Sequence, residues 1–330
     1  MTTILVTGGA GYIGSHTCKA LAAKGYTPVV FDNLSTGHRE FVKWGELIEG
    51  DIRDTAKLRS ALEDTSAKAV IHFAALAYVG ESIQQPQRYY ENNVVGSLSL
   101  LCAMRDAGCQ SLVFSSTCAV YGEVTELPIN IAHPTHPINP YGRSKRLVEQ
   151  VLEDCHSAYQ LDSVALRYFN AAGADLDGEI GERRDPEPHL IPNVIRAALN
   201  ADAILELYGD DYPTSDGSCV RDYIHVADLA SAHVKALEYL VMDGGRHGAH
   251  RFNLGAGTGT SNKEMIALVE HYAKAKIETR VMPRRPGDPS ALYADITHTR
   301  KVLGWEPKVS DIDTIIRSAL AWEQKELDRE

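Results

Sequence analysis

The fold of this 330-residue chain is decided by one stretch near its start, Thr3-Ile4-Leu5-Val6-Thr7-Gly8-Gly9-Ala10-Gly11-Tyr12-Ile13-Gly14-Ser15. The apolar run Ile4–Val6 is typical of a parallel strand that is buried on both faces. Three glycines follow it directly, and their spacing suits a tight turn, a close approach of phosphate to the backbone and close helix packing. An apolar stripe then predicts a helix that ends near Lys24 and points its positive end at the loop. We therefore expect a strand, a turn and a helix that bind a pyrophosphate.

An acidic residue at a suitable distance supports this interpretation over the alternative that the glycines are ordinary loop residues. A second apolar run, Pro28–Phe31, ends in Asp32, which lies eighteen residues after Gly14. A carboxylate at that position contacts the hydroxyls of the adenosine ribose and repels a 2′-phosphate, so NAD is expected rather than NADP. The G-x-x-G-x-x-G spacing resembles the short-chain dehydrogenase/reductase superfamily, in particular its extended branch.

Composition and charge disfavour several classes of partner. The net charge of −11 would repel nucleic acid and anionic membranes over most of the surface, so no nucleic acid and no membrane partner is expected. Strand signals begin within three residues of Met1, and no apolar run reaches the roughly eighteen residues of a membrane span. The six cysteines form no C-x-x-C pair and lie mostly in apolar segments, which favours buried free thiols over disulfides or zinc. A cytoplasmic protein is therefore expected.

Strand and helix signals alternate through the first half of the chain with the spacing of βαβ units. This alternation predicts an α/β fold with a Rossmann-type doubly wound parallel sheet. Further strands are expected at Leu47–Glu49, Ala69–Phe73, Leu112–Phe114 and Val164–Arg167. Helices are expected at Thr55–Glu63, Pro86–Ala107 and Tyr141–Gln160.

The composition changes after Gly173, where a polar stretch rich in glycine, proline and charge follows, and we place a domain boundary there. Residues 1–173 are predicted to form an NAD-binding Rossmann domain. Residues 174–330 are predicted to form mainly a smaller mixed α/β lobe for the substrate, with segments that return to the first domain. Its expected helices are Ile191–Leu199, Val226–Leu240 and Ser261–Tyr272, and its expected strands are Leu205–Tyr208, Arg251–Leu254 and Thr279–Met282.

A tyrosine and a lysine four residues apart, Tyr141 and Lys145, are the strongest candidates for chemistry. On a helix this spacing places both side chains on one face. A tyrosine with its ordinary pKa near 10 is a poor base, but a lysine cation and an oxidised nicotinamide beside it would both favour the phenolate. Thr117 follows an expected strand end, where it could donate a hydrogen bond to the same substrate oxygen. The alternative is a surface tyrosine near an ordinary Ser/Thr loop.

Two other patterns are interpreted as structural. Tyr272 and Lys276 repeat the four-residue spacing, but no strand-end hydroxyls precede them. His133 and His136 have H-x-x-H spacing in a proline-rich loop without an acidic or cysteine partner, so no metal site is expected.

The chain resembles the UDP-glucose 4-epimerases over nearly its whole length. The matching motifs are Gly8–Ser15, Asp51-Ile52, Val79–Ser82, Asn92-Asn93, Tyr141–Lys145, Arg167–Asn170, Val220–His225, Asn253–Gly257 and Arg284–Asp288. This resemblance implies an isomerase with NAD as cofactor that interconverts UDP-glucose and UDP-galactose by transient oxidation at sugar carbon 4. It also implies a homodimer, joined through the helices Pro86–Ala107 and Tyr141–Gln160 as a four-helix bundle.

The resemblance also implies roles for individual residues. The expected catalytic residues are Tyr141, Lys145 and Thr117. The expected cofactor contacts are Gly8, Gly11, Tyr12, Ile13, Gly14, Asp32, Asn33, Asp51, Ile52, Phe73, Ala74, Ala75, Asn92, Ser115, Tyr141, Lys145 and Tyr168. The expected substrate contacts are Thr117, Tyr141, Asn170, His189, Leu190, Leu207, Tyr208, Arg221, Arg285, Asp288 and Leu292. The arginines among them supply the forked donors that an acidic protein needs to hold a diphosphate.

A few positions bear on the alternatives within this resemblance. A family lysine that reaches the NAD pyrophosphate is Ala77 here, which bears on how tightly NAD is retained, and the usual catalytic serine is Thr117. Related sugar-nucleotide dehydratases carry an Asp-Glu pair where this chain has Cys118 and Ala119, and non-catalytic regulators lack the Tyr or the Lys. Leu292 is expected beside sugar carbon 2, where it would slow N-acetylated sugars. The alternatives are that Leu292 is a core leucine, or that the substrate is another UDP-sugar, N-acetylated or a pentose.

Overall fold

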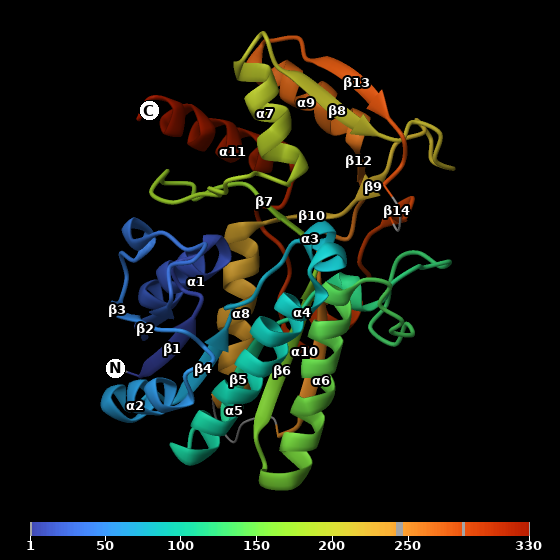
Figure 1. Cartoon of the computed structure of the whole chain (residues 1–330). Coiled ribbons are helices and arrows are strands. Elements are labelled where there is room, and N and C mark those ends of the chain that lie inside the picture. The colour runs from blue at the N-terminus through green and yellow to red at the C-terminus, as the bar shows by residue number, and fades with distance from the viewer. Residues whose placement is uncertain (1, 242–246, 286–287, 330) are drawn as a thin grey trace.

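The computed structural model describes residues 2–241, 247–285 and 288–329, which fold into two lobes (Figure 1). The larger lobe contains a sheet with helices on both faces and begins with the N-terminal strand. The smaller lobe, at the top of Figure 1, contains the C-terminal helix.

Seven parallel strands form the sheet of the larger lobe, in the order β11-β6-β5-β4-β1-β2-β3. They are β1 (Thr3–Thr7), β2 (Thr27–Asp32), β3 (Glu46–Glu49), β4 (Ala69–His72), β5 (Ser111–Ser115), β6 (Asp162–Tyr168) and β11 (Ala249–Leu254). The direction of winding reverses between β1 and β4, and doubly wound sheets bind ligands at the carboxyl ends of strands beside such a reversal. The predicted Rossmann-type fold is confirmed.

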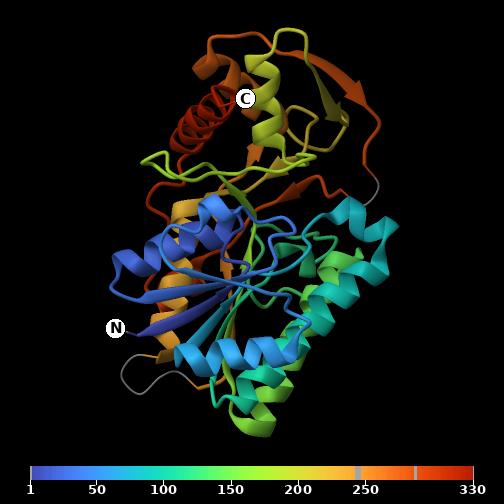
Figure 2. The same ribbon diagram turned by 60° about the vertical axis from the view of Figure 1, so that its left-hand side comes forward.

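Helices cover both faces of this sheet (Figure 2). On one face lie α1 (Tyr12–Ala23), α8 (Val226–Val241) and α10 (Thr297–Leu303). On the other face lie α2 (Thr55–Thr65), α5 (Gly96–Asp106) and α6 (Pro140–Tyr159). Leu5 and Val6 pack into opposite cores, which explains why the strands read as continuous apolar runs rather than as alternating ones.

Elements from the second half of the chain, α10 among them, complete the larger lobe. β11 pairs in parallel with β6, and α8 packs against α1. The sheet therefore draws on residues from both sides of position 173, and a domain boundary at that position stays a prediction.

The expected helix Pro86–Ala107 consists of three segments, which are α4 (Pro86–Tyr89), the π-helical turn η2 (Tyr90–Val95) and α5. Within η2 the Asn93 side chain accepts a hydrogen bond from the Leu76 N–H at 2.8 Å and donates one to the Leu76 carbonyl at 2.9 Å. The amide thus ties the helix to the loop that follows β4. Apolar spacing continues through this segment, so the sequence pattern did not indicate the π turn, a feature that is frequent at functional sites.

The smaller lobe packs helices around short strands. α7 (Leu190–Leu199), α9 (Asn262–Ala273) and α11 (Ile312–Leu327) share one apolar core. β8 (Ile204–Tyr208) pairs with β13 (Glu278–Met282), β7 (Asn170–Ala172) with β10 (Tyr223–His225), and β9 (Val220–Arg221) with both β12 (Thr260–Ser261) and β14 (Ala291–Leu292). The two-residue strands, α10 and α11 were not predicted, and for the strands the reason is that a pair of residues carries no periodicity.

The remaining short elements are α3 (Val79–Gln84), η1 (Arg39–Phe41) and η3 (Cys118–Val120). All six cysteines are free, and Cys102 is exposed on α5. Across the residues that the structure describes, no helix combines the length and the apolar character needed to cross a membrane.

Candidate active site

The glycine-rich loop between β1 and α1 is packed so closely that side chains would clash. Gly8 has a φ of +73°, and a Cβ there would lie 2.5 Å from the Ala74 nitrogen. A Cβ on Gly14 would lie 2.2 Å from the Gly8 carbonyl oxygen. The first glycine therefore permits the turn, and the third permits α1 to pack on the loop, as the spacing predicted. Because α1 begins at Tyr12, its positive N-terminal end lies at this loop.

Asp32 connects the end of β2 to the glycine loop. Its Oδ2 accepts a hydrogen bond from the Ala10 N–H at 3.0 Å, and its Oδ1 accepts one from the Leu34 N–H at 2.8 Å. Burial raises the pKa of this carboxyl, and the two backbone N–H groups counteract that rise. The side chain is thus fixed at the sheet edge, where it fits the predicted contact with ribose hydroxyls.

One cavity collects nearly all of the expected cofactor contacts. Those that line it are Gly8, Gly11, Tyr12, Ile13, Gly14, Asp32, Asn33, Ile52, Phe73, Ala74, Ala75, Asn92, Ser115, Tyr141, Lys145 and Tyr168. Asp51 is the exception, because it lies outside this lining and pairs with Arg53 Nη2 at 2.7 Å. The hydrogen bonds from Arg53 hold the pKa of Asp51 well below its usual range.

The cavity also includes residues that the sequence did not indicate. Ser35, Thr36, Gly37, Arg183 and Arg184 line it as well, and so does Ala77, at the position of the family lysine. The two arginines lie in the polar stretch that was interpreted as a domain boundary. An Arg-Arg pair within a largely acidic segment was the available signal. The glycine loop, the carboxylate and the small alanines fit NAD in both shape and chemistry.

Tyr141 and Lys145 lie on α6 and are 7% and 3% exposed. Burial raises the pKa of Tyr141 well above its ordinary value, while a hydrogen bond with Thr117 acts in the opposite direction. Lys145 donates from Nζ to the Ser115 carbonyl at 2.8 Å, and burial lowers its pKa to about 7 although Glu149 opposes this. The protein alone therefore holds the phenol neutral. The expected phenolate needs positive charge that NAD, rather than the lysine alone, would bring.

A buried polar network supports this face of α6 from behind. Glu149, one helical turn beyond Lys145, accepts hydrogen bonds from Ser116 Oγ at 2.6 Å and from Arg167 Nε and Nη2 at 2.9 and 2.6 Å. Arg167 Nη1 donates in turn to the Tyr121 hydroxyl at 3.1 Å. Because a buried charge without its partner costs about 3 to 5 kcal/mol, this network fixes α6 against the ends of β5 and β6.

A second pocket opens beside the first, within the smaller lobe. The expected substrate contacts that line it are Asn170, His189, Leu190, Tyr208, Arg221, Arg285 and Asp288. Arg221 Nη2 forms an ion pair with Asp288, and the Arg285 guanidinium lies 3.9 Å from the centre of the Tyr208 ring. Glu182, Cys219, Tyr223, Asn262, Trp322 and Glu323 also line it and were not predicted. The pocket thus joins cations to an aromatic ring, a combination that suits a nucleoside diphosphate.

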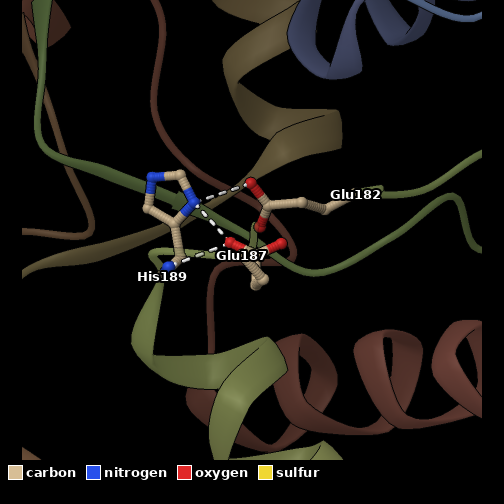
Figure 3. A group of neighbouring side chains, drawn as sticks. All are labelled: Glu182, Glu187 and His189. Atoms are coloured by element: carbon tan, nitrogen blue, oxygen red, sulfur yellow. Dashed lines mark hydrogen bonds and ion pairs between the residues drawn. The ribbon is translucent and has the colours of Figure 1, made fainter. Parts of the chain in front are cut away.

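His189 lies between two glutamates in this pocket (Figure 3). Its Nδ1 lies 3.0 Å from an oxygen of Glu182 and 3.0 Å from an oxygen of Glu187. Although burial acts to lower it, these carboxylates raise the pKa of His189 to about 9. The two carboxylates thus favour the protonated form of the imidazole.

Four expected substrate contacts do not line this pocket, and one of them, Tyr141, lines the cofactor cavity instead. The Leu207 side chain packs in the core of the smaller lobe, because alternate residues of β8 face inward while Tyr208 faces the pocket. Leu292 packs beside a buried cluster that includes Val120 and Ile129. Thr117 is 6% exposed and caps η3 by accepting a hydrogen bond from the Ala119 N–H. Contact of Leu207, Leu292 or Thr117 with a substrate stays a prediction.

The fold and the site together define a class of protein. A Rossmann-type sheet, a glycine loop, a ribose-facing carboxylate and a buried Tyr/Lys pair are the parts of a short-chain dehydrogenase/reductase type of enzyme that works through NAD. The second pocket, with Arg221 and Arg285 in its lining, suits a phosphorylated substrate.

Comparisons with known proteins define the family more closely. Residues 4–255 match the NAD dependent epimerase/dehydratase family. A UDP-glucose 4-epimerase of Rhizobium leguminosarum bv. trifolii is 53% identical over 323 residues, 98% of each chain. The crystal structure of a Brucella ovis UDP-glucose 4-epimerase in complex with NAD has 52% identity and a TM-score of 0.93, over 97% of this chain and 98% of that one. That of a Bifidobacterium longum UDP-glucose 4-epimerase in complex with NAD⁺ and UDP has 40% identity and a TM-score of 0.93, over 99% of both chains. The chain belongs to the NAD dependent epimerase/dehydratase family and, within it, to the UDP-glucose 4-epimerases.

Proposed function

We propose that the protein interconverts UDP-glucose and UDP-galactose with NAD as its cofactor, and so supplies UDP-galactose in galactose metabolism. This proposal rests on the position of the cofactor cavity next to the substrate pocket. Tyr168, at the end of β6, lines the cofactor cavity, and Asn170, two residues later in β7, lines the substrate pocket. A UDP-sugar that spans both would have its phosphates among the cations of the smaller lobe and its sugar beside Tyr141. The family match and the 53% identity to a UDP-glucose 4-epimerase support the same activity.

NAD and three side chains have separate roles in the proposed reaction. When bound, NAD accepts the hydride from sugar carbon 4 and later returns it to the opposite face of the ring. Tyr141, as phenolate, takes the proton of the 4-hydroxyl and gives it back, and Thr117 donates a hydrogen bond to the same oxygen. Lys145, held by the Ser115 carbonyl, contributes positive charge that favours the phenolate. The net redox change is zero.

Both faces of one carbon must reach the same cofactor, so the sugar must turn over between the two transfers. Arg221 and Arg285 would hold the UDP part throughout, and the hexose must be bound loosely enough to rotate. Tight binding of UDP combined with loose binding of the sugar is therefore expected from this pocket.

The dehydratase alternative lacks an acid at the required place. Burial raises the pKa of Cys118 to about 12, and Ala119 has no proton-transfer group. Neither residue of η3 can help to eliminate water at neutral pH, whereas a 4-epimerase needs no such acid. A non-catalytic regulator would not need the buried Tyr141 and Lys145.

The preferred sugars are proposed to be the unsubstituted hexoses, with UDP-N-acetylhexosamines slow. Leu292 is the proposed gate, although its packing beside Val120 and Ile129 also fits a core leucine. Catalytic efficiencies for UDP-galactose and UDP-N-acetylgalactosamine, measured in wild type and Leu292→Gly, decide the matter. No gain on the N-acetylated sugar in the variant would remove Leu292 as the gate.

We also propose a homodimer in the cytoplasm. Exposed apolar side chains lie on the segments that were expected to form the bundle, at Val95, Leu98 and Leu147, and on the adjacent α3, at Val79 and Ile83. A second copy would cover these side chains, which a soluble monomer would leave in water. A monomeric mass in light scattering would contradict the dimer.

One assay tests the activity. Purified protein receives UDP-galactose without added NAD, and the nucleotide sugars are then separated and quantified. We expect a mixture of UDP-galactose and UDP-glucose whose sum stays constant, without net NADH. A dehydrated sugar, or no conversion even after NAD is supplied, would overturn the proposed function.

A further inference from the structure

Arg184 brings a positive charge to the cofactor cavity from the connection between β7 and α7. Among the described residues, the cations that line this cavity are Lys145, Arg183 and Arg184. A dinucleotide carries a diphosphate with two negative charges, and the helix end at Tyr12 offers only about half a positive charge. A full cation beside the glycine loop would therefore add substantially to cofactor binding in a chain whose net charge is −11.

The other two cations already have firm partners. Lys145 donates to the Ser115 carbonyl, and burial lowers its pKa to about 7. Arg183 forms ion pairs with Glu40 and Glu326. Its guanidinium also lies 5.0 Å from the centre of the Phe41 ring. Arg183 therefore shares its charge between two carboxylates, whereas Arg184 pairs with one, and Lys145 serves Tyr141.

Arg184 is held in place but keeps donors available. Its Nε donates to Glu182 at 2.9 Å, and its Nη1 donates to the Tyr78 hydroxyl at 3.3 Å. Within the described part of the chain, Nη2 makes no hydrogen bond, and the side chain is 21% exposed. The guanidinium is therefore anchored through Nε and Nη1 while Nη2 stays available, and this geometry is preorganised for an anion.

The charge of Arg184 reaches the middle of the cavity. Burial raises the pKa of both Tyr12 and Tyr168, and the positive charge of Arg184 counteracts that rise at each hydroxyl. Tyr12 begins α1 beside the glycine loop, and Tyr168 ends β6 near the catalytic tyrosine. The guanidinium thus acts on one lining residue beside the glycine loop and on another beside the catalytic tyrosine.

We propose that Arg184 binds the diphosphate of NAD, with Glu182 and Tyr78 as the residues that position it. This inference rests on the proposed NAD cofactor, and it assigns a cofactor contact to the segment that also forms the substrate pocket. The same Glu182 carboxylate holds His189, which lines that pocket (Figure 3). One glutamate therefore fixes a cation at each of the two cavities.

The test compares ligands that share the adenosine but differ in phosphate. Cofactor-free protein is titrated with NAD, ADP-ribose, adenosine and UDP by calorimetry, in wild type, Arg184→Ala and Arg184→Lys. Arg59→Ala, which removes an exposed arginine from α2, is the control for the loss of one charge. We expect Arg184→Ala to weaken NAD and ADP-ribose by about tenfold to a hundredfold, because hydrogen bonds to charged groups contribute about 1.5 to 3 kcal/mol. Adenosine and UDP should bind as in wild type, Arg184→Lys should recover part of the loss, and Arg59→Ala should lose nothing.

Three results would overturn the proposal. ADP-ribose could bind Arg184→Ala as it binds wild type, UDP could be the ligand that is weakened, or Arg184→Lys could bind as poorly as Arg184→Ala in spite of its charge. Thermal unfolding of each variant identifies a folding defect, which would weaken adenosine as well. Since these titrations involve no turnover, their outcome is independent of whether UDP-galactose is epimerised.

Discussion

The cofactor cavity and the substrate pocket are built in different ways. The cofactor cavity depends on small residues such as Gly8, Gly14 and Ala74, which lie in the glycine loop, the first turn of α1 and the segment after β4. The substrate pocket depends on charged side chains, such as Arg221 and Asp288, which come from distant segments. The cofactor cavity therefore recognises its ligand by leaving space beside backbone N–H groups. The substrate pocket recognises its ligand with the forked donors of arginine side chains.

The largest expected effect lies where the two regions meet, at Tyr141. Tyr141→Phe removes the proton acceptor but keeps the ring, so turnover should fall by about 10²- to 10⁴-fold while UDP and NAD still bind. Tyr272→Phe is the matched control, because Tyr272, near the end of α9, also precedes a lysine by four residues but lines neither cavity. Steady-state kinetics and binding titrations measure both variants. Near-normal turnover in Tyr141→Phe would remove it as the acid/base.

The second prediction tests whether the cofactor cavity requires a residue without a side chain at position 14. Gly14→Ala would place a Cβ 2.2 Å from the Gly8 carbonyl oxygen, so the glycine loop must shift. We expect a loss of stability of about 3 kcal/mol and loss of NAD, with UDP binding retained in the protein that folds. Gly25→Ala is the control, because a Cβ there meets no atom within 4 Å and only the positive φ of +81° opposes it. Equal NAD affinity in the two variants would show that space at position 14 is not what the cofactor needs.

A smaller effect tests the forked donors in the substrate pocket. Arg221→Lys keeps the charge beside Asp288 but loses the second donor, so KM for UDP-galactose should rise about tenfold to a hundredfold with kcat little changed. Arg280→Lys, at an exposed position of β13, should leave KM unaltered. A fall in kcat at constant KM would place Arg221 in the chemical step instead.

The buried histidines of the larger lobe differ from His189 in a way that the pH dependence of stability can measure. Burial lowers the pKa of His16 to about 4, of His72 to about 3 and of His233 to about 4, all in the larger lobe. Between these values and the ordinary 6.5 the unfolded chain binds more protons, so stability should fall as the pH drops from 6.5. His189, with its pKa raised to about 9, contributes stability that is present below 6.5 and lost as the pH rises through 9.

Denaturant titrations at pH 5, 7 and 9 measure both slopes. We expect the acid loss to reach about 2 kcal/mol per buried histidine at pH 5, from 1.36 kcal/mol per unit. His189→Asn should flatten the alkaline slope and leave the acid slope unchanged. An unchanged alkaline slope would mean that Glu182 and Glu187 do not hold His189 as a cation.

The contrast between the two regions also explains what the sequence could predict. The glycine loop and Asp32 were predictable, because their spacing along one strand–turn–helix unit is fixed by local geometry. The inward direction of Leu207 and the position of Arg184 were not, because each depends on how a segment packs against the opposite lobe. The resemblance could name Arg221 as a ligand contact, but its ion pair with Asp288, sixty-seven residues away in the chain, required the structure.

The central claim is that the hydrogen at sugar carbon 4 leaves as hydride and returns to the same sugar. UDP-galactose that carries deuterium at carbon 4 tests this directly, with mass spectrometry and NMR of the UDP-glucose product. The account predicts that the product keeps its deuterium at carbon 4 and that none appears in water, since the reduced cofactor and the 4-keto sugar stay together in one site. Loss of the label to solvent would mean that the hydrogen moves as a proton, and it would contradict the proposed NAD-dependent epimerisation.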